Sequence, residues 1–303
     1  MAVHVQDARA IVTSYLAFID DVTYATASAG QKAAALLAVN DGYRRYLTGD
    51  YVDEMGDKQS HLWSSLATLA QITLRAGDED YDLPAAYEGN TEPFVYDYDS
   101  LTYGEELKLV NHSQLLRFRR DNNTEGQPTD YTVRAKVHAA ATGTVHEWIC
   151  YPKPVSATVT SAGTTVTRVT GPDFHDDLVG TTIEITGSAD GEVQSVTSAD
   201  VLVSDAAITA ATATEAFYDN GLTIRYRYRA AMAALTDSAT VYPSGLIGCG
   251  DLIVQAARML DEHDTGGKDG TETARYYRMM GEMVKRDKAL IPASQNLQKR
   301  IQR

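Results

Sequence analysis

Asp173, His175, Asp176 and Asp177 bring three carboxylates and one histidine within five residues. Carboxylate oxygens and imidazole nitrogens are common ligands of Ca²⁺ and Zn²⁺. The spacing does not fit an EF-hand loop, which places carboxylates at alternate positions and ends on a glutamate. We therefore interpret these four residues as a solvated turn and predict no metal site there.

A second pair of carboxylates, Asp97 and Asp99, flanks Tyr98 at the end of residues 93–98, which predict a strand. Because alternate residues of a strand point to one face, the two acids would lie together like an acid–base pair. No histidine or basic residue is close in the sequence. We therefore interpret the pair as part of a solvated loop.

Short motifs add no catalytic candidate. Gly266-Gly267-Lys268 has the residue types of a phosphate-binding loop, but the GxxxxGK[ST] spacing is absent. The sequence contains no HExxH, CxxC, GxSxG or GxGxxG motif, and His146-Glu147 lacks the spacing of a metal site. We predict no catalytic residue, no cofactor and no metal.

Residues 222–229 predict a regular strand with apolar side chains on one face and the arginines Arg225, Arg227 and Arg229 on the other. Such a row fits a track for phosphate groups. The net charge of the chain is −14, from 41 acidic and 27 basic residues, and this favours salt bridges to carboxylates of the same or an adjacent subunit.

Composition narrows the class of protein. The acidic balance argues against a dedicated nucleic-acid binder and is compatible with a wall past which DNA slides, or simply with good solubility. We expect the two cysteines, Cys150 and Cys249, to be reduced and buried. No apolar run approaches the roughly 20 residues of a membrane span, and the first residues do not resemble a signal peptide. We therefore expect synthesis in the cytoplasm.

The ends of the sequence predict two pairs of helices. Residues 8–19 have one apolar face, and Ser28 with Gln31 forms a capping box that starts a second helix, closed by Gly49. Its predicted buried residues are Ala33, Leu36, Leu37, Tyr43 and Leu47. Two more helices are predicted at residues 244–262 and at about 270–290, the second with an apolar side at Ala274, Tyr277, Gly281, Val284 and Ile291.

The middle of the chain predicts a helix at about residues 111–120 and strands at 131–137 and 145–151. Residues 153–217 then form a distinct module with short Thr- and Val-rich strands separated by Gly, Asp and Ser, typical of a small sandwich or barrel. Residues 154–217 carry nine acids and one base. We expect the strand at 222–229 to pair with the one ending at Tyr151.

The stretch from residue 60 to residue 84 combines a core tryptophan, Trp63, with a strand, an acidic turn and the sequence Tyr81-x-Leu83-Pro84. We expect these four residues to anchor a core, with Pro84 opening a short helix through Tyr87. This block, preceded by Gly-Tyr-Arg-Arg-Tyr-Leu at residues 42–47, resembles the adaptor (head–tail connector, head-completion) proteins of tailed bacteriophages.

The resemblance covers roughly residues 1–152 and 218–291, which we interpret as an adaptor core. It implies an α+β fold: a helical bundle of two N-terminal helices, two C-terminal helices and a middle helix, with a small sheet region and the inserted all-β module. It also implies a virion protein that forms a ring of twelve copies beneath the portal. Such a ring joins the head to the tail or nozzle and lines a channel through which viral DNA passes without specific binding.

The basic tail, residues 292–303, lies outside the matched region. We expect its Lys299, Arg300 and Arg303 either to dock on the portal or to remain disordered in the isolated chain. Two other functions stay open. One is a different tail, baseplate or fibre-attachment protein that uses the same β module. The other is a phage-encoded hydrolase, which would need a cleft with paired carboxylates.

Overall fold

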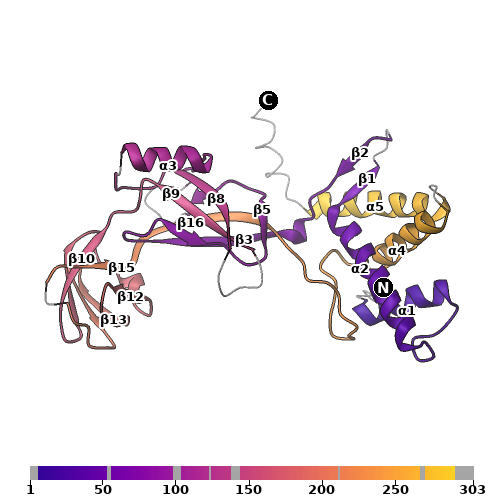
Figure 1. Cartoon of the computed structure of the whole chain (residues 1–303), viewed down its shortest axis with the longest axis horizontal. Coiled ribbons are helices and arrows are strands. Elements are labelled where there is room, and N and C mark those ends of the chain that lie inside the picture. The colour runs from indigo at the N-terminus through magenta and orange to yellow at the C-terminus, as the bar shows by residue number, and fades with distance from the viewer. Residues whose placement is uncertain are drawn as a thin grey trace. The chain divides into compact units, whose positions relative to one another are not determined.

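The computed structural model describes residues 6–52, 56–97, 104–122, 124–137, 144–210, 212–266 and 270–290. The chain folds into two compact units (Figure 1). The helical unit consists of Met1–Ala67 and Ala230–Arg303, and the β unit consists of Thr68–Arg229. The chain therefore leaves the helical unit once and returns to it once.

The helical unit contains four α-helices, a short hairpin and a 3-10 turn among its described residues. Their bounds are α1 Ala8–Ile19, α2 Ala29–Thr48, β1 Asp50–Val52, β2 Lys58–Ser60, η1 Ser64–Leu66, α4 Cys249–Gly266 and α5 Thr271–Leu290.

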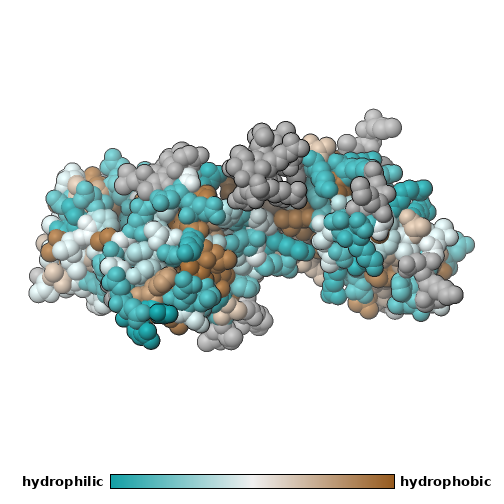
Figure 2. All heavy atoms as spheres, turned by 90° about the horizontal axis from the view of Figure 1, so that it is seen from above, coloured by the Kyte–Doolittle hydropathy of each residue, from teal (hydrophilic) through white to brown (hydrophobic). Residues whose placement is uncertain are grey.

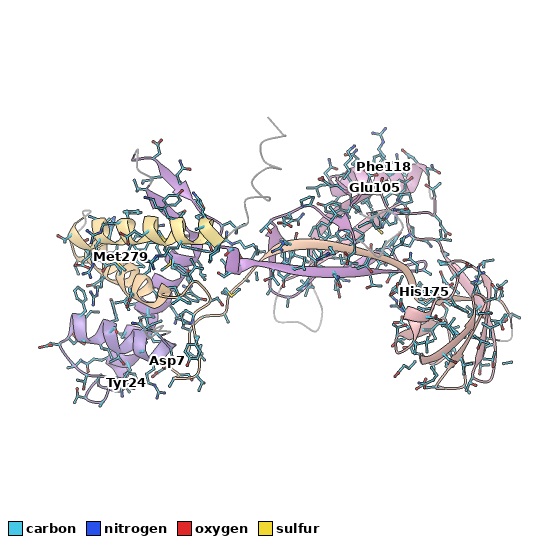
Figure 3. All side chains as sticks on the ribbon, turned by 180° about the vertical axis from the view of Figure 1, so that it is seen from behind. Asp7, Tyr24, Glu105, Phe118, His175 and Met279 are labelled. Carbon is cyan, nitrogen blue, oxygen red and sulfur yellow. The ribbon has the colours of Figure 1, made fainter. Side chains whose placement is uncertain are left out.

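Local side-chain contacts determine where the first two helices begin and end. Asp7 caps α1 by accepting a hydrogen bond from the Ala10 amide (Figure 3). Ser28 and Gln31 form the predicted capping box of α2. Gly49 ends α2 in the left-handed conformation, with φ of 70°. A Cβ atom at Gly49 would lie only 1.9 Å from the His61 carbonyl oxygen, so a glycine is needed here.

Helices α1, α2, α4 and α5 share one apolar core. Helix α2 comes close to α4 at Gly42, where a Cβ atom would lie 2.6 Å from the Ile253 carbonyl oxygen. Trp63 is fully buried in this core, donates its Nε1–H to the Tyr46 carbonyl oxygen at 2.8 Å, and packs its ring 4.6 Å from that of Tyr46. Helices from both ends of the sequence are therefore held around one tryptophan.

The β unit contains two four-stranded sheets, one helix and a barrel. The first sheet has the order β3-β16-β5, with β6 also paired to β16, and the second has the order β4-β9-β8-β7. The bounds are β3 Ala67–Arg75, β4 Asp80–Asp82, β5 Tyr87–Asn90, β6 Val95–Tyr96, β7 Lys108–Leu109, α3 His112–Asp121, β8 Asp130–Val137, β9 Thr144–Tyr151 and β16 Asp219–Ala230.

Aromatic side chains from the two sheets meet around Phe94. Its ring centroid lies 4.3 Å from that of Tyr226, 4.6 Å from that of Tyr131 and 5.9 Å from that of Trp148. All four side chains are buried. Large aromatic rings bury much apolar area with few rotatable bonds, so this cluster helps to hold the two sheets together.

The barrel is closed by six antiparallel strands in the order β10-β11-β14-β13-β12-β15. Their bounds are β10 Ala157–Ala162, β11 Thr165–Thr170, β12 Thr182–Ile185, β13 Gly191–Ser198, β14 Val201–Ser204 and β15 Thr214–Phe217, with the turn η2 at Asp176–Leu178. Buried side chains at alternate positions, such as Val159, Val166 and Leu202, fill its interior. Closure leaves no sheet edge exposed.

The predicted fold class, a helical bundle with a small sheet region, is wrong. Among the described residues, 33% are in strands and 32% in helices, and the strands build two sheets and a closed barrel. The middle helix, α3, does not belong to a bundle, because it packs on β8 and β9. The sequence pattern led us to underestimate the strand content, because several strands are only two to four residues long.

One strand pairing, one helix start and one predicted short helix also differ from expectation. Strand β16 pairs with β3, β5 and β6, and not with β9, because β4 and β8 already occupy both edges of β9. Helix α4 begins at Cys249 rather than at residue 244, since Gly245 and Gly248 have φ of 152° and 90°. Pro84 opens a turn closed by the Tyr87 amide, and strand β5 follows instead of a helix.

The buried faces of α2 and α5 agree with those predicted in part. Tyr43 and Val284 are buried, and Leu36, Leu47 and Tyr277 are partly buried against the core. Ala33 and Leu37 of α2 and Ala274 of α5 are exposed, and Ile291 lies outside the described residues. The core residues that the prediction missed include Ala35, Val39 and Tyr46 of α2 and Thr273, Tyr276, Met280 and Met283 of α5. Helix α3 and strands β8 and β9 lie within a residue of the predicted positions.

Replacement of Trp63 by Ala is expected to lower the free energy of unfolding of the helical unit by about 3–5 kcal/mol, because it opens a large cavity and removes the bond to Tyr46. Urea unfolding followed by circular dichroism measures this. Leu62→Ala is the control, since Leu62 is the exposed neighbour and should change stability by about 0.5 kcal/mol or less. Equal effects of the two changes would contradict the assigned core role.

Candidate functional site

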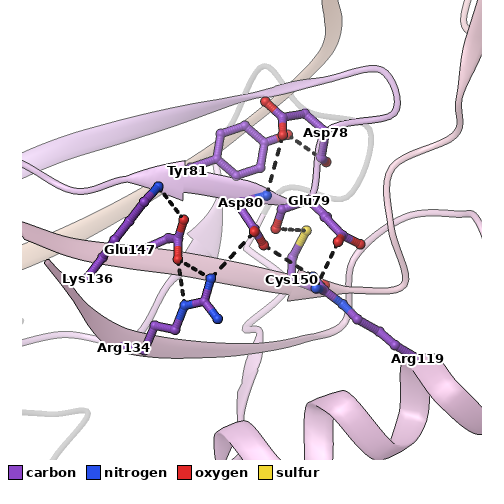
Figure 4. Close-up of polar contacts among 9 residues, drawn as sticks. All are labelled: Asp78, Glu79, Asp80, Tyr81, Arg119, Arg134, Lys136, Glu147 and Cys150. Carbon is purple, nitrogen blue, oxygen red and sulfur yellow. Dashed lines mark hydrogen bonds and ion pairs between the residues drawn. The ribbon is translucent and has the colours of Figure 1, made fainter. Parts of the chain in front are cut away.

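The densest group of ionisable side chains in the β unit lies on β4, β8 and β9 (Figure 4). At its centre is Glu147, which is 2% exposed. The Arg134 Nε and the Lys136 Nζ lie 2.6 Å and 2.9 Å from its two carboxylate oxygens. Register places the three together, since Arg134 is opposite Glu147 on the neighbouring strand and Lys136 is two residues further on the same face.

Helix α3 adds a third cation, Arg119, to this group. Arg119 contacts the Glu79 carboxylate at 3.0 Å and the Asp80 carboxylate at 3.6 Å, and donates a hydrogen bond to the Cys150 carbonyl oxygen at 2.9 Å. Asp80 also lies 3.8 Å from Arg134. The ion pairs therefore connect α3, β4, β8 and β9 in one network (Figure 4).

The protonation states show what this network can do chemically. Burial favours protonation of Glu147, but the hydrogen bonds from Lys136 and Arg134 outweigh it and lower the pKa of Glu147 below its ordinary value. Burial raises the pKa of the Cys150 thiol far above neutrality. A carboxylate neutralised by two cations is a poor base and a protonated thiol is a poor nucleophile, so the network is a structural cross-link.

The three arginines of β16 are paired in the same way. Arg225 contacts Asp97 at 2.9 Å, Arg227 contacts Glu92 at 3.3 Å and Arg229 contacts Glu88 at 3.2 Å. This confirms the salt-bridge interpretation of the arginine row. Asp97 is buried and also accepts a hydrogen bond from Gln71 at 3.0 Å, so it belongs to the sheet and not to a solvated loop. Asp99 lies outside the described residues.

A second buried carboxylate, Asp287 of α5, organises the helical unit. It is fully buried and lies 2.7 Å from the His61 Nε2. It also accepts hydrogen bonds from the Ser64 amide, at 2.9 Å, and from the Ser64 hydroxyl. These contacts bind the last turn of α5 to the segment on either side of Trp63.

Ser64, His61 and Asp287 have the residue types of a catalytic triad but not its geometry. In a triad the histidine lies between the serine and the acid, so that it can take the serine proton. Here the serine and the histidine both bind the carboxylate. The group therefore satisfies a buried charge, and His61 binds the carboxylate instead of the Ser64 hydroxyl.

Sequence reasoning missed this cluster, because no motif links residues so far apart. A signal existed in the spacing of α5. Thr273, Tyr276, Met280, Met283 and Asp287 recur at three- and four-residue steps on the buried face. An acid at a core position of a helix needs donors, which points to a buried polar contact.

The turn at Asp173, His175, Asp176 and Asp177 was considered above as a metal site and interpreted as a solvated turn. Among the described residues, no group of three or more histidine, cysteine or acidic side chains could hold an ion. Asp173 pairs with Arg168 at 2.7 Å, and Asp200 pairs with the same guanidinium. His175 lies before η2 beside the barrel, 3.3 Å from the Asp219 carbonyl oxygen (Figure 3).

The structure also describes most of the other residues that the sequence analysis singled out. Leu83 is buried, whereas Tyr81 and Pro84 are half-buried. The Tyr81 hydroxyl accepts a hydrogen bond from the Arg75 amide at 2.9 Å and lies 3.1 Å from the Asp78 carbonyl oxygen, which holds the acidic turn (Figure 4). Gly267, Lys268 and the tail residues Lys299, Arg300 and Arg303 lie outside the described residues. Cys150 and Cys249 are free and buried, as expected.

Glu147→Gln is expected to lower the free energy of unfolding at pH 7 by about 1–3 kcal/mol, because it removes a buried charge that two cations contact. The folded-state pKa of Glu147 is lowered, so its contribution is present above the unfolded pKa of about 4.3 and is lost as the pH falls through the folded value. The difference between variant and parent should therefore shrink on acidification.

Urea unfolding at pH 7 and at a series of acidic pH values measures this difference. Asp82→Asn is the matched control, because exposed Asp82 contacts the same Lys136 at 3.5 Å and should matter little. A stability difference for Glu147→Gln that stays constant with pH would argue against the assigned charge network.

Asp287→Asn is expected to lower the melting temperature of the helical unit and to cost about 2–3 kcal/mol, because buried donors of His61 and Ser64 lose a charged acceptor. Glu282→Gln, an exposed change of the same kind on α5, serves as the control and should change stability by about 0.5 kcal/mol or less. Calorimetry gives both values. Similar melting of the two variants would show that the Asp287 cluster does not hold the unit together.

No known protein-family model matches the chain. A search of curated proteins also finds no match. Among the described residues, no helix has the length and apolar character needed to cross a membrane.

Proposed function

We propose that this protein is a structural subunit of a tailed-phage particle, an adaptor that forms a ring under the portal and joins head to tail. The observation that carries the proposal is the assembly around Trp63. Helices from both ends of the chain share one core with the tryptophan of the block that resembles the adaptor family. A family-like block at the centre of the fold is stronger support than the same letters in a peripheral loop.

The pairing of cations with carboxylates in the β unit supports a structural role. The buried or half-buried cations of the β unit, including Arg119, Arg134 and Arg225, are engaged with carboxylates. The arginines of β16 are paired, which makes them poor phosphate ligands. A net charge of −14 then leaves a surface that repels a polyanion, as a passage for DNA requires.

Exposed apolar side chains are available for contacts between subunits. Figure 2 shows a largely hydrophilic face interrupted by hydrophobic patches. The large exposed residues of the helical unit include Leu37, Tyr242, Ile247 and Leu290, and those of the β unit include Leu69, Leu109 and Val169. Head-to-tail contacts through two different surfaces close a ring when the rotation between copies is right, and twelve copies match the resemblance.

The closed barrel favours a second candidate, attachment of tail or fibre components. Its surface is acidic and its strands are all paired, so it is a self-contained module that other proteins can contact through its loops. On this account the chain is a virion protein further down the tail. The two candidates predict different partners.

Mixing the purified chain with purified portal rings tests the proposal. Native mass spectrometry should detect portal rings carrying several copies of the chain, with an upper limit set by the portal symmetry. Leu37→Asp and Val169→Asp place a charge on the helical unit and on the barrel respectively, and report which surface the assembly uses. Binding to purified tail or fibre proteins without binding to portal would contradict the adaptor assignment and support the second candidate.

A further inference from the structure

A polar pocket of about 410 Å³ opens in the helical unit where the end of α2, the hairpin of β1 and β2, and α5 meet (Figure 1). Its volume lies in the range of about 300–1,000 Å³ that is common for ligand pockets. The charged and phenolic groups of its lining belong to Arg45, Asp50, Tyr51, Lys58 and Tyr277. The pocket therefore combines two cations and two phenols with one carboxylate.

The guanidinium of Arg45 is only partly engaged by the protein. Its Nη1 lies 3.0 Å from the Asp50 carboxylate, and its Nη2 donates to the Tyr277 hydroxyl at 3.4 Å. Its Nε is buried and has no acceptor among the described residues. A guanidinium has five N–H groups, and 32% of the Arg45 side chain is exposed, so N–H groups remain for a further acceptor.

Two tyrosine hydroxyls at the pocket accept hydrogen bonds from cations. Tyr277 accepts from the Arg45 Nη2, and Tyr51 accepts from the Lys288 Nζ at 3.2 Å. Neither hydroxyl donates to an acceptor within the described part of the chain. Because a phenol that accepts a hydrogen bond can still donate its own O–H, both hydroxyls can donate to an oxygen atom of a ligand.

The pocket has an excess of positive charge, although the net charge of the chain is −14. Asp50 is the one carboxylate on its lining among the residues that the structure describes, and it is already paired with Arg45. The Lys58 ammonium group is exposed and has no ion-pair partner among these residues. Lys288 lies close by, with its ammonium group 5.5 Å from the centre of the Tyr51 ring. An anion in the pocket would therefore meet unpaired positive charge.

We propose that this pocket binds the carboxylate group of an acidic polypeptide segment. The two oxygen atoms of a carboxylate can accept about four hydrogen bonds, and the two tyrosines, Arg45 and Lys58 offer donors for them. Hydrogen bonds from cations to carboxylates are shorter and stronger than those between neutral groups. The methylene groups of a glutamate side chain can lie against the tyrosine rings.

The charge of the pocket favours a carboxylate over a phosphate. Two cations and one acid line the pocket, so one positive charge remains, and one carboxylate balances it. A phosphate monoester would bring about 1.5–2 negative charges at neutral pH. A DNA duplex carries a negative charge about every 1.7 Å, and a chain of net charge −14 repels such a dense polyanion.

Titration of the full chain with a capped tetraglutamate peptide, followed by NMR of the Tyr51 and Tyr277 ring signals, tests the proposal. A capped tetraglutamine peptide is the neutral probe, and inorganic phosphate is the second anion. We expect tetraglutamate to shift both ring signals until they saturate, with an affinity that falls as salt is added. We expect no saturable shift from tetraglutamine and weaker binding of phosphate.

Lys58→Gln should weaken tetraglutamate binding about three- to tenfold, because it removes a charge-assisted hydrogen bond, and Tyr277→Phe should weaken it about threefold. Lys58 is exposed, so its replacement should leave the melting temperature unchanged. Lys32→Gln is the matched control and should bind like the parent. Lys32 also lies over a tyrosine ring, that of Tyr24 at 4.4 Å, but it is in the first turn of α2, about 20 Å from Arg45.

Three results would overturn the proposal: equal affinity for the two peptides, tighter binding of phosphate than of tetraglutamate, or equal affinity of the Lys58 and Lys32 variants. Sedimentation of the chain without peptide then identifies the source of the acidic segment. Self-association that excess tetraglutamate reverses assigns the segment to a second copy, and a monomeric chain assigns it to another protein. Because no portal is present, these results are independent of the adaptor assignment.

Discussion

The helical unit depends on two buried polar groups, the Trp63 indole N–H and the Asp287 carboxylate, that find hydrogen-bond partners at one short segment. Trp63 needs an acceptor for its indole N–H and finds the carbonyl oxygen of Tyr46. Asp287 needs donors for a carboxylate without solvent and finds them on His61 and Ser64, on either side of Trp63. An apolar ring and a charged group thus hold the same segment from α2 and α5. The segment leads directly into β3.

In the β unit, too, buried charged groups are paired with groups of opposite charge. Glu147 is buried between cations from the neighbouring strand, and Arg119 is held between carboxylates of β4. These pairs contribute to the choice of strand register, since a shift by one residue would move Arg134 away from Glu147. The charged groups of this network therefore serve strand pairing, which is one reason for proposing a structural role.

Local signals in the sequence were enough to place most elements. The capping box at Ser28, the closing Gly49 and the alternation in residues 222–229 depend on neighbours only, and they reappear in the structure. Strand partners and helix faces depend on distant residues. Nothing near Tyr151 reveals that β4 occupies the edge of β9, and nothing near Asp287 names His61 as its partner. Asp97 was taken for a loop residue because Arg225, its partner, lies 128 positions away.

The central claim is that the chain works as an adaptor ring, and cryo-electron microscopy of the intact particle at the tail vertex tests it most directly. The account predicts density for this chain as a closed ring against the portal, with its acidic surface along the DNA path. Density only at fibres or further down the tail would contradict the adaptor assignment. Absence of the chain from the particle would contradict a structural role altogether.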